Sequence, residues 1–157
     1  MPFYRHLGNI PHKRHTVFKQ ANGELHHEQL FGTIGFDGMS SLLYHIHPPT
    51  LVKDILGKKD ISPKVAIDKN LQMRAFKGFD VPIVDDLIDS RIPVLTNSDV
   101  SLYLSRPGNV NENYFYKNVD ADEVIFIHEG KGTLRSQVGN IEFSYGDYLV
   151  IPRGMIY

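Results

Sequence analysis

The sequence predicts a mainly β protein, built from short strands joined by tight turns. The first observation is the alternation of apolar and polar residues in Val100, Leu102 and Leu104, which is the pattern of a half-buried strand. The second is the regular recurrence of such runs after residue 99, with turn residues between them, which is typical of a sandwich or barrel. The third is a set of glycines that permit turns between strands, at positions 130, 132, 139, 146 and 154.

Composition places the chain among soluble globular proteins. A length of 157 residues suits one domain, or one domain plus an arm, and the hydrophobic and charged fractions of 41% and 22% are ordinary. The net charge is −1 and the basic residues are spread along the chain, so no nucleic-acid partner is expected. The sequence contains no cysteine, which excludes disulfides and thiolate metal sites and fits a reducing compartment.

Targeting signals are not expected from this sequence. The first 15 residues are basic but contain no apolar core, unlike a secretory signal. No apolar run approaches the roughly 20 residues that span a membrane. We therefore expect a cytoplasmic protein without a membrane partner.

Residues 1–97 predict an N-terminal arm, a small sheet and one or two short helices. A hairpin is expected at the turn-forming pair Asn22-Gly23, and a strand over residues 40–47, ended by two prolines. Short helices are expected over residues 50–56, with Thr50 as N-cap, and over residues 79–90. Residues 64–76 are strand-like.

Residues 98–157 predict the beginning of a barrel. Strands are expected over residues 100–104, 123–128, 132–137, 140–143 and 148–151, with a turn at Val138-Gly139. Four or five strands leave a jelly roll of about eight strands unclosed. Because proteins avoid open strand edges, we expect either a longer protein, of which this chain is the N-terminal part, or pairing by earlier strands, and we favour the first.

The spacing of glutamate, glycine and proline residues within 116–157 resembles the frame of a cupin, a jelly-roll or double-stranded β-helix barrel. Glu123 is followed seven residues later by Gly130, and then come Gly146, Pro152 and Gly154. A metal-binding cupin carries two histidines before the glutamate and a third after the glycine–proline motif. Here these slots hold other residues: Tyr116 and Asn118 (or Lys117 and Val119) in the first pair, and Tyr157 in the third.

Glu123 occupies the glutamate position of the cupin frame, but the histidines that would bind a metal together with it are absent. A single carboxylate without imidazole partners binds iron weakly. We therefore expect Glu123 to accept hydrogen bonds from the hydroxyl groups of Tyr116 or Tyr157, or to be exposed at the start of a strand. Neither a metal ligand nor a catalytic or cofactor-binding residue is expected in this chain.

The N-terminal half extends the resemblance to one enzyme family. The segments KRHTVF, ELHHEQLFGTIGFDG, SLLYHIHPPT and IPRGMIY begin at residues 13, 24, 41 and 151. Together with the cupin frame they resemble homogentisate 1,2-dioxygenase over essentially the whole chain. The resemblance implies a two-cupin, non-haem Fe(II) oxidoreductase that opens the ring of homogentisate with O2 to maleylacetoacetate, in tyrosine and phenylalanine catabolism.

The resemblance also implies that metal binding and scaffolding belong to different barrels of the protein. The family's iron is held by two histidines and a carboxylate in its second barrel, so the Fe(II) ligands are expected outside this chain. Residues 98–157 are then the start of a cupin that binds no metal, the chain ends before the catalytic cupin, and the 157 residues alone are inactive. A homo-oligomer is implied as well. The alternative function is a non-enzymatic cupin that binds a small molecule or serves assembly.

His45 and His47 form a weaker, alternative metal pair. On one strand their side chains point to the same face, which is a chelating geometry. A glutamate at the cupin distance does not follow, so hydrogen bonding in the core or at an interface is favoured. A metalloenzyme that uses this pair is a third hypothesis.

The other histidines and Arg153 allow less specific interpretations. His26 and His27 are adjacent on an expected strand, so their side chains face opposite ways and one is expected in solvent. His12 and His15 lie beside basic residues, which oppose cation binding. Arg153 is expected at the surface, with a bidentate carboxylate contact as the alternative.

Overall fold

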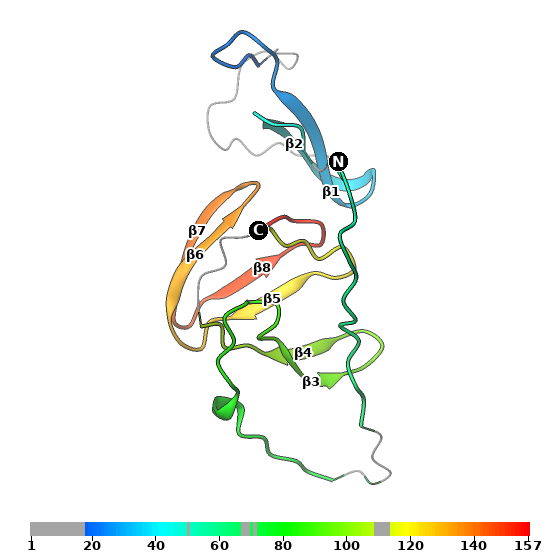
Figure 1. Ribbon diagram of the computed structural model, residues 1–157, viewed down its shortest axis with the longest axis vertical. Helices are drawn as coiled ribbons and strands as arrows, with labels where there is room; N and C mark the ends of the chain where they lie inside the picture. Colours follow the sequence, from blue (N-terminus) through cyan, green and yellow to red (C-terminus); the bar gives the residue numbers. More distant parts are fainter. Residues whose placement is uncertain (1–17, 50, 67–69, 71, 109–113) are drawn as a thin grey trace. The chain divides into compact units, whose positions relative to one another are not determined.

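The computed structural model describes residues 18–49, 51–66, 70, 72–108 and 114–157. In these residues the protein consists of eight β-strands and one short 3-10 helix, so the prediction of a mainly β fold is confirmed. The strands pair into four antiparallel sheets of two strands each (Figure 1). The described strands do not close into a barrel.

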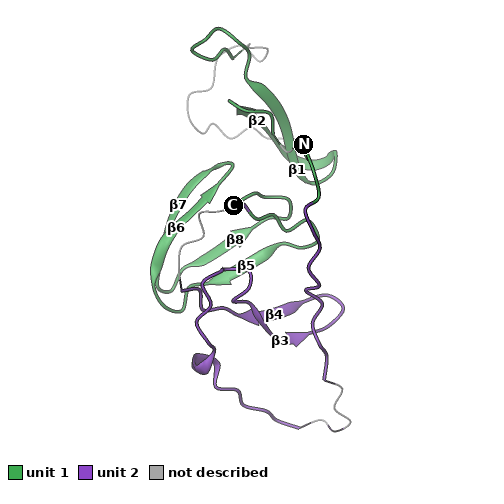
Figure 2. Cartoon of the chain, viewed as in Figure 1, with its two compact units in different colours: residues 1–55, 116–157 green, residues 56–115 purple. Residues whose placement is uncertain are grey.

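Packing divides the chain into two compact units (Figure 2). Unit 1 comprises Met1–Ile55 and Tyr116–Tyr157, and unit 2 comprises Leu56–Phe115. The first unit therefore joins the N-terminal sheet to the C-terminal segment that carries the cupin frame. The boundary predicted between residues 97 and 98 concerns where a barrel begins, and it stays a prediction.

The N-terminal sheet of unit 1 is a hairpin. Strand β1 (His27–Ile34) pairs with β2 (Asp37–His45) from His27 opposite His45 to Ile34 opposite Asp37. The connecting turn contains Gly35, whose φ of 58° lies in the left-handed region that glycine adopts without strain. The predicted strand over residues 40–47 therefore exists, but it begins earlier and ends at His45.

A second, smaller hairpin precedes β1 and confirms the predicted turn at Asn22-Gly23. The backbone N–H of Gln20 donates to the carbonyl of Glu24 at 2.7 Å, and Lys19 forms a bridge with Leu25. Gly23 has a φ of 86°, which explains why a glycine occupies this position.

Two further sheets form the C-terminal part of unit 1. Strand β5 (Glu123–Phe126) pairs with β8 (Tyr148–Ile151), and β6 (Lys131–Ser136) pairs with β7 (Gly139–Ser144). The two-residue turn between β6 and β7 consists of Gln137 and Val138, one residue earlier than predicted. The apolar side chains buried in the described part of the chain are those of Ile127, Leu149 and Ile151.

The opposite face of the β5–β8 sheet is apolar and uncovered. Val124 lies opposite Val150, and Phe126 lies opposite Tyr148, with the two rings 4.7 Å apart. These four side chains are between 44% and 67% exposed. One face of this sheet thus belongs to the small core, and the other presents valines and aromatic rings to solvent.

Unit 2 contains the 3-10 helix η1 (Gly78–Asp80) and a sheet of β3 (Ile92–Thr96) and β4 (Ser101–Leu104). The α-helix predicted over residues 79–90 is wrong, because η1 is followed by a bridge between Val84 and Pro107 and then by a turn over residues 87–90. Pro82 disfavours helical geometry in the preceding Val81, whose φ and ψ of −65° and 138° are extended.

The helix predicted over residues 50–56 is also wrong for its described part. Residues 51–56 contain no helical turn, and Thr50, the expected N-cap, lies outside the described residues. A helix of this length has few internal hydrogen bonds to offset the cost of its first turn. The described residues of 64–76 form no strand.

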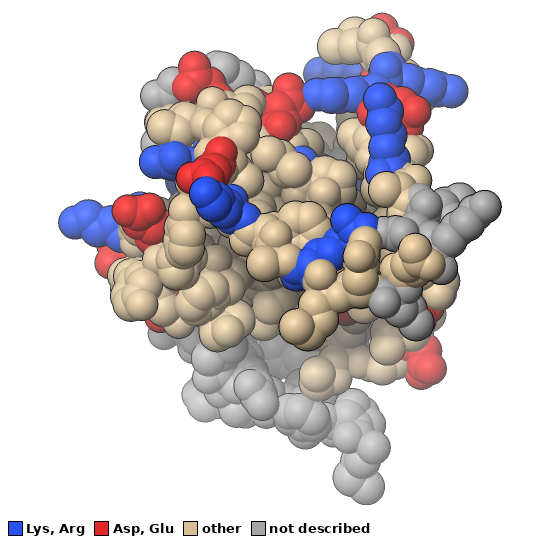
Figure 3. Space-filling view, turned by 90° about the horizontal axis from the view of Figure 1, so that it is seen from below, with Lys and Arg blue, Asp and Glu red and all other residues tan. Residues whose placement is uncertain are grey.

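The surface has a mixed character. On the face in Figure 3, lysine and arginine side chains are interspersed with aspartate and glutamate, and uncharged residues lie between them. As for membranes, the described part of the chain contains no helix with the length and hydropathy that a span requires.

Candidate functional site

The four residues at the altered cupin ligand positions meet in the structure. Asn118 Nδ2 donates a hydrogen bond to Glu123 Oε1 at 3.0 Å, and the Tyr116 hydroxyl donates to the same oxygen at 3.4 Å. The hydroxyl of Tyr157 donates to Glu123 Oε2. We call these four residues the Glu123 cluster. The sequence frame therefore identifies side chains that lie together in space.

Backbone pairing places the two tyrosines of the cluster side by side. The N–H of Tyr116 donates to the carbonyl of Tyr157 at 2.9 Å, and the N–H of Tyr157 donates to the carbonyl of Tyr116 at 3.0 Å. Their rings meet edge to face, with centroids 5.5 Å apart and planes at 80°. Both phenols thereby approach the carboxylate of Glu123, the first residue of β5.

Asn118 is positioned by its own local contacts. Its carbonyl accepts a hydrogen bond from the N–H of Gly154 at 2.7 Å, and its Oδ1 accepts from the N–H groups of Asp120 and Ala121. With Oδ1 occupied in this turn, the amide nitrogen is directed toward Glu123. The cluster therefore ties three segments together: residues 116–118, the start of β5, and residues 154–157.

The donor set of the cluster does not fit a non-haem iron centre. Such a centre uses two imidazoles and one carboxylate, whereas Glu123 is accompanied by two phenols and an amide that all donate hydrogen bonds. Among residues 18–49, 51–66, 70, 72–108 and 114–157, no group of three or more His, Asp or Glu side chains has a metal-binding arrangement. In the Glu123 cluster, both oxygens of the carboxylate accept hydrogen bonds from neighbouring side chains.

His45 and His47 are separated by the end of β2. His45 is the last residue of the strand, and its Nε2 lies 2.8 Å from Gln29 Oε1. His47 lies in the bend that follows. The alternation that would align the two side chains stops between them, and the register instead places His27 opposite His45.

Arg153 has a carboxylate neighbour, Asp122. The Arg153 side-chain Nε lies 3.6 Å from Asp122 Oδ1, and its backbone N–H donates to the same oxygen at 2.8 Å. Both side chains are about half exposed, so this ion pair contributes little to stability. With Thr33 and Ile34 they line an open cavity of about 400 Å³.

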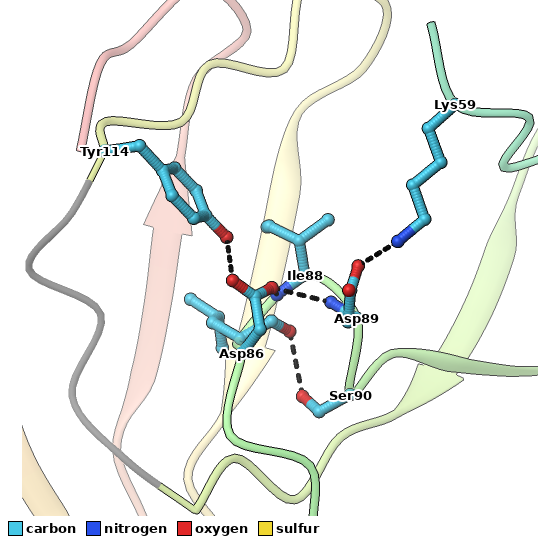
Figure 4. Close-up of polar contacts among 7 residues, drawn as sticks. Lys59, Asp86, Ile88, Asp89, Ser90 and Tyr114 are labelled. Atoms are coloured by element: carbon cyan, nitrogen blue, oxygen red, sulfur yellow. Dashed lines mark hydrogen bonds and ion pairs between the residues drawn. The ribbon is translucent and has the colours of Figure 1, made fainter.

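Unit 2 contains a polar cluster around Asp86 that sequence reasoning missed (Figure 4). The Tyr114 hydroxyl donates to Asp86 Oδ2 at 2.5 Å, while Oδ1 accepts from the N–H groups of Ile88 and Asp89 at 2.8 Å each. Lys59 pairs with Asp89. An aspartate followed by a turn is a local signal for the two backbone contacts, but the tyrosine partner is remote in sequence.

These contacts shift two pKa values in unit 2. The hydrogen bond from Tyr114 is the main cause that lowers the pKa of Asp86, with further contributions from the N–H groups of Asp89 and Ile88. Burial, followed by the hydrogen bond to Asp86, raises the pKa of Tyr114 to about 12. In unit 1, burial and the nearby Glu28 raise the pKa of Tyr44.

The chain is similar to a curated protein whose name states an activity. The chain is 36% identical over all of its 157 residues to a protein of Saccharolobus solfataricus named "Putative dioxygenase". It spans 41% of the length of that relative. No protein-family model matches the chain, and no solved structure matches it. The chain is therefore similar, along its whole length, to part of a protein that carries the name of a dioxygenase.

Proposed function

We propose that this chain is the N-terminal, structural portion of a non-haem Fe(II) dioxygenase that opens the ring of homogentisate with O2 to give maleylacetoacetate. The observation that carries the proposal is the 36% identity over all 157 residues to the Saccharolobus solfataricus protein named "Putative dioxygenase". The substrate and the metal rest on the resemblance of the segments at residues 24–50 and 151–157 to the homogentisate 1,2-dioxygenase family. The chain spans 41% of the relative, and the proposal assigns the activity to a longer protein.

In this proposal the 157 residues provide a scaffold and not the reacting groups. The Glu123 cluster fills the altered cupin ligand positions with hydrogen bonds, which supports placing the iron ligands outside these 157 residues. Fe(II) held there would supply the Lewis-acid chemistry that brings the substrate and O2 together. The contribution of Tyr116, Asn118, Glu123 and Tyr157 is to hold the surrounding loops in one arrangement. A cytoplasmic homo-oligomer is part of the same proposal.

Oxygen uptake tests the proposed activity. The full translation product of the gene, loaded with Fe(II), is expected to consume O2 when homogentisate is added, and the isolated 157-residue chain is not. Gentisate, in which the carboxylate is attached directly to the ring, serves as the substrate control and is expected to react more slowly. Failure of the iron-loaded full product to consume O2 with homogentisate would remove the dioxygenase proposal.

A second candidate is a non-enzymatic cupin module that binds a small molecule or serves assembly. It is favoured by the donor set of the Glu123 cluster, which consists of hydrogen-bond donors around one carboxylate. The open cavity beside Arg153 is the place where a small ligand would be sought. This second function predicts calorimetric binding of a small carboxylate that is lost in Arg153→Ala, with no O2 uptake by the full product.

A further inference from the structure

Histidines gather at the open end of the β1–β2 hairpin. His27 begins β1, His45 ends β2, and the register places them directly opposite each other. Directly opposed residues of an antiparallel pair project their side chains on the same face, with Cβ atoms about 4.5–5.5 Å apart. Two imidazoles from different strands therefore lie within reach of one ion.

Gln29 orients one of these imidazoles. It lies two residues after His27 and thus on the same face of the sheet, and its Oε1 lies 2.8 Å from Nε2 of His45. An amide oxygen only accepts hydrogen bonds, so this contact fits the tautomer with the proton on Nε2, in which Nδ1 of His45 is the nitrogen available to a metal ion. In metal sites, ligating histidines are commonly fixed by such a bond through their other nitrogen.

The backbone of this site is also held in place. Nδ1 of His26 lies 3.3 Å from the carbonyl oxygen of His45, which links the strand end of β2 to the residue before β1. The opposite face of the hairpin carries the Glu28–Tyr44 pair, so the nearest carboxylate of β1 points away from the two imidazoles. The ligand set on the His27 face is therefore nitrogen-based.

We propose that His27 and His45 form a two-imidazole binding site for a divalent transition-metal ion. Imidazole suits Cu²⁺, Zn²⁺ and Ni²⁺, whereas Mg²⁺ and Ca²⁺ prefer oxygen ligands, so the site selects the former group. The described residues offer no group of three or more His, Asp or Glu ligands, so the proposal assigns the remaining coordination positions to water. This site is independent of the proposed dioxygenase activity and requires only the hairpin of this chain.

Metal titration of single variants tests the site. After treatment with a chelator, the 157-residue chain is titrated with ZnCl2 and, separately, with CuCl2 by isothermal calorimetry. His27→Ala and His45→Ala are each expected to weaken one binding event at least tenfold, with Cu²⁺ bound more tightly than Zn²⁺ by the unaltered chain. His128→Ala, remote from β1 and β2 in sequence, is the matched histidine control and is expected to retain that event.

Variants of His47 and Gln29 distinguish the His27/His45 site from the His45/His47 pair. His47→Ala is expected to retain the affinity for the metal ion. A loss of affinity as large as in His27→Ala would assign the site to the His45/His47 pair and overturn the proposal. Gln29→Leu is expected to weaken binding severalfold and Gln29→Glu to restore it, because only the second keeps an acceptor for His45. His27 is exposed, and an unchanged circular dichroism spectrum of His27→Ala checks that the hairpin persists. Absence of binding at millimolar metal, or unchanged affinity in His27→Ala, also overturns the proposal.

Discussion

The phenol of Tyr157 donates a hydrogen bond to the carboxylate of Glu123, and so joins the last residue of the chain to the first residue of β5. Both residues stand at positions that resemble the metal-ligand slots of a cupin. The hydrogen bond connects the phenol and the carboxylate directly, without a metal ion between them. Hydrogen bonding therefore provides here the cross-link that coordination provides in a metal-binding cupin.

Replacement of Glu123 tests how much this cross-link stabilises the fold. Glu123→Ala removes the hydrogen bonds that Tyr116, Asn118 and Tyr157 donate to this carboxylate, and we expect a loss of about 2 kcal/mol in the free energy of unfolding. Urea denaturation measures the change. Glu129→Ala is the matched control, because Glu129 is exposed, and it is expected to have little effect. Equal stability of the two variants would contradict a structural role for the cluster.

Restored imidazoles test whether the Glu123 cluster occupies a cupin metal position. The triple variant Tyr116→His, Asn118→His and Tyr157→His, made together with His27→Ala, places three imidazoles around Glu123. We expect it to bind Zn²⁺ with one ion per chain, because nitrogen ligands and a carboxylate suit this metal. Calorimetry is the measurement.

The control for this variant is the same protein with Glu123→Ala, which is expected to bind the ion more weakly. If the triple variant binds no more Zn²⁺ than His27→Ala alone, the geometrical correspondence with a cupin site is wrong.

The contact between Tyr114 and Asp86 predicts that the stability of the folded protein depends on pH in both the acid and the alkaline range. The raised pKa of Tyr114 means that its contribution to stability is present below its ordinary pKa of about 10 and is lost as pH rises through about 12. The lowered pKa of Asp86 means that its contribution is present above its ordinary pKa of about 3.9 and is lost as pH falls through the lower folded value.

The free energy of unfolding, measured as a function of pH, checks the direction of both changes. Tyr114→Phe is expected to be less stable than the unaltered chain between these limits and to converge with it at both extremes. Tyr145→Phe is the control, since this exposed tyrosine has a side chain that faces largely into solvent. A stability difference for Tyr114→Phe that stays constant from acid to alkaline pH would show that the contact does not couple to protonation.

Gly132 is predicted to be intolerant of a side chain. A Cβ atom at this position of β6 would lie 2.7 Å from Cζ of Phe143, the residue opposite it on β7. We expect Gly132→Ala to destabilise the protein by about 1–3 kcal/mol, because the ring has to shift within its packing. Gly57→Ala is the control, as a Cβ there meets nothing within 4 Å. Thermal unfolding compares them, and partial rescue of Gly132→Ala by Phe143→Leu is expected.

Local patterns in the sequence predict much of this fold. The strand predicted over residues 148–151 is β8, and the hairpin predicted at Asn22-Gly23 is present, because alternation and turn chemistry act between close neighbours. The helix predicted over residues 79–90 is absent from the structure. The spacing of Ile83 and Leu87 favours a helix, but Pro82 is a local signal against one.

Long-range relationships account for the features that local patterns do not predict. The spacing of the frame residues around Glu123 identifies the cluster because it resembles a known barrel, yet which oxygen each donor contacts depends on packing. His45 pairs with His27 rather than His47 because strand register is set across the hairpin. Tyr114 reaches Asp86 from a distant part of unit 2, and no local pattern marks the pair.

The uncovered face of Val124, Phe126, Tyr148 and Val150 has a practical consequence for the isolated chain. Sulfate and similar salts are excluded from protein surfaces and so favour association through uncovered apolar groups. The sequence pI of about 6.7 adds to this effect, because near that pH little net repulsion keeps molecules apart. Colloidal stability during purification will therefore be greatest in dilute, sulfate-free buffer held well away from neutrality.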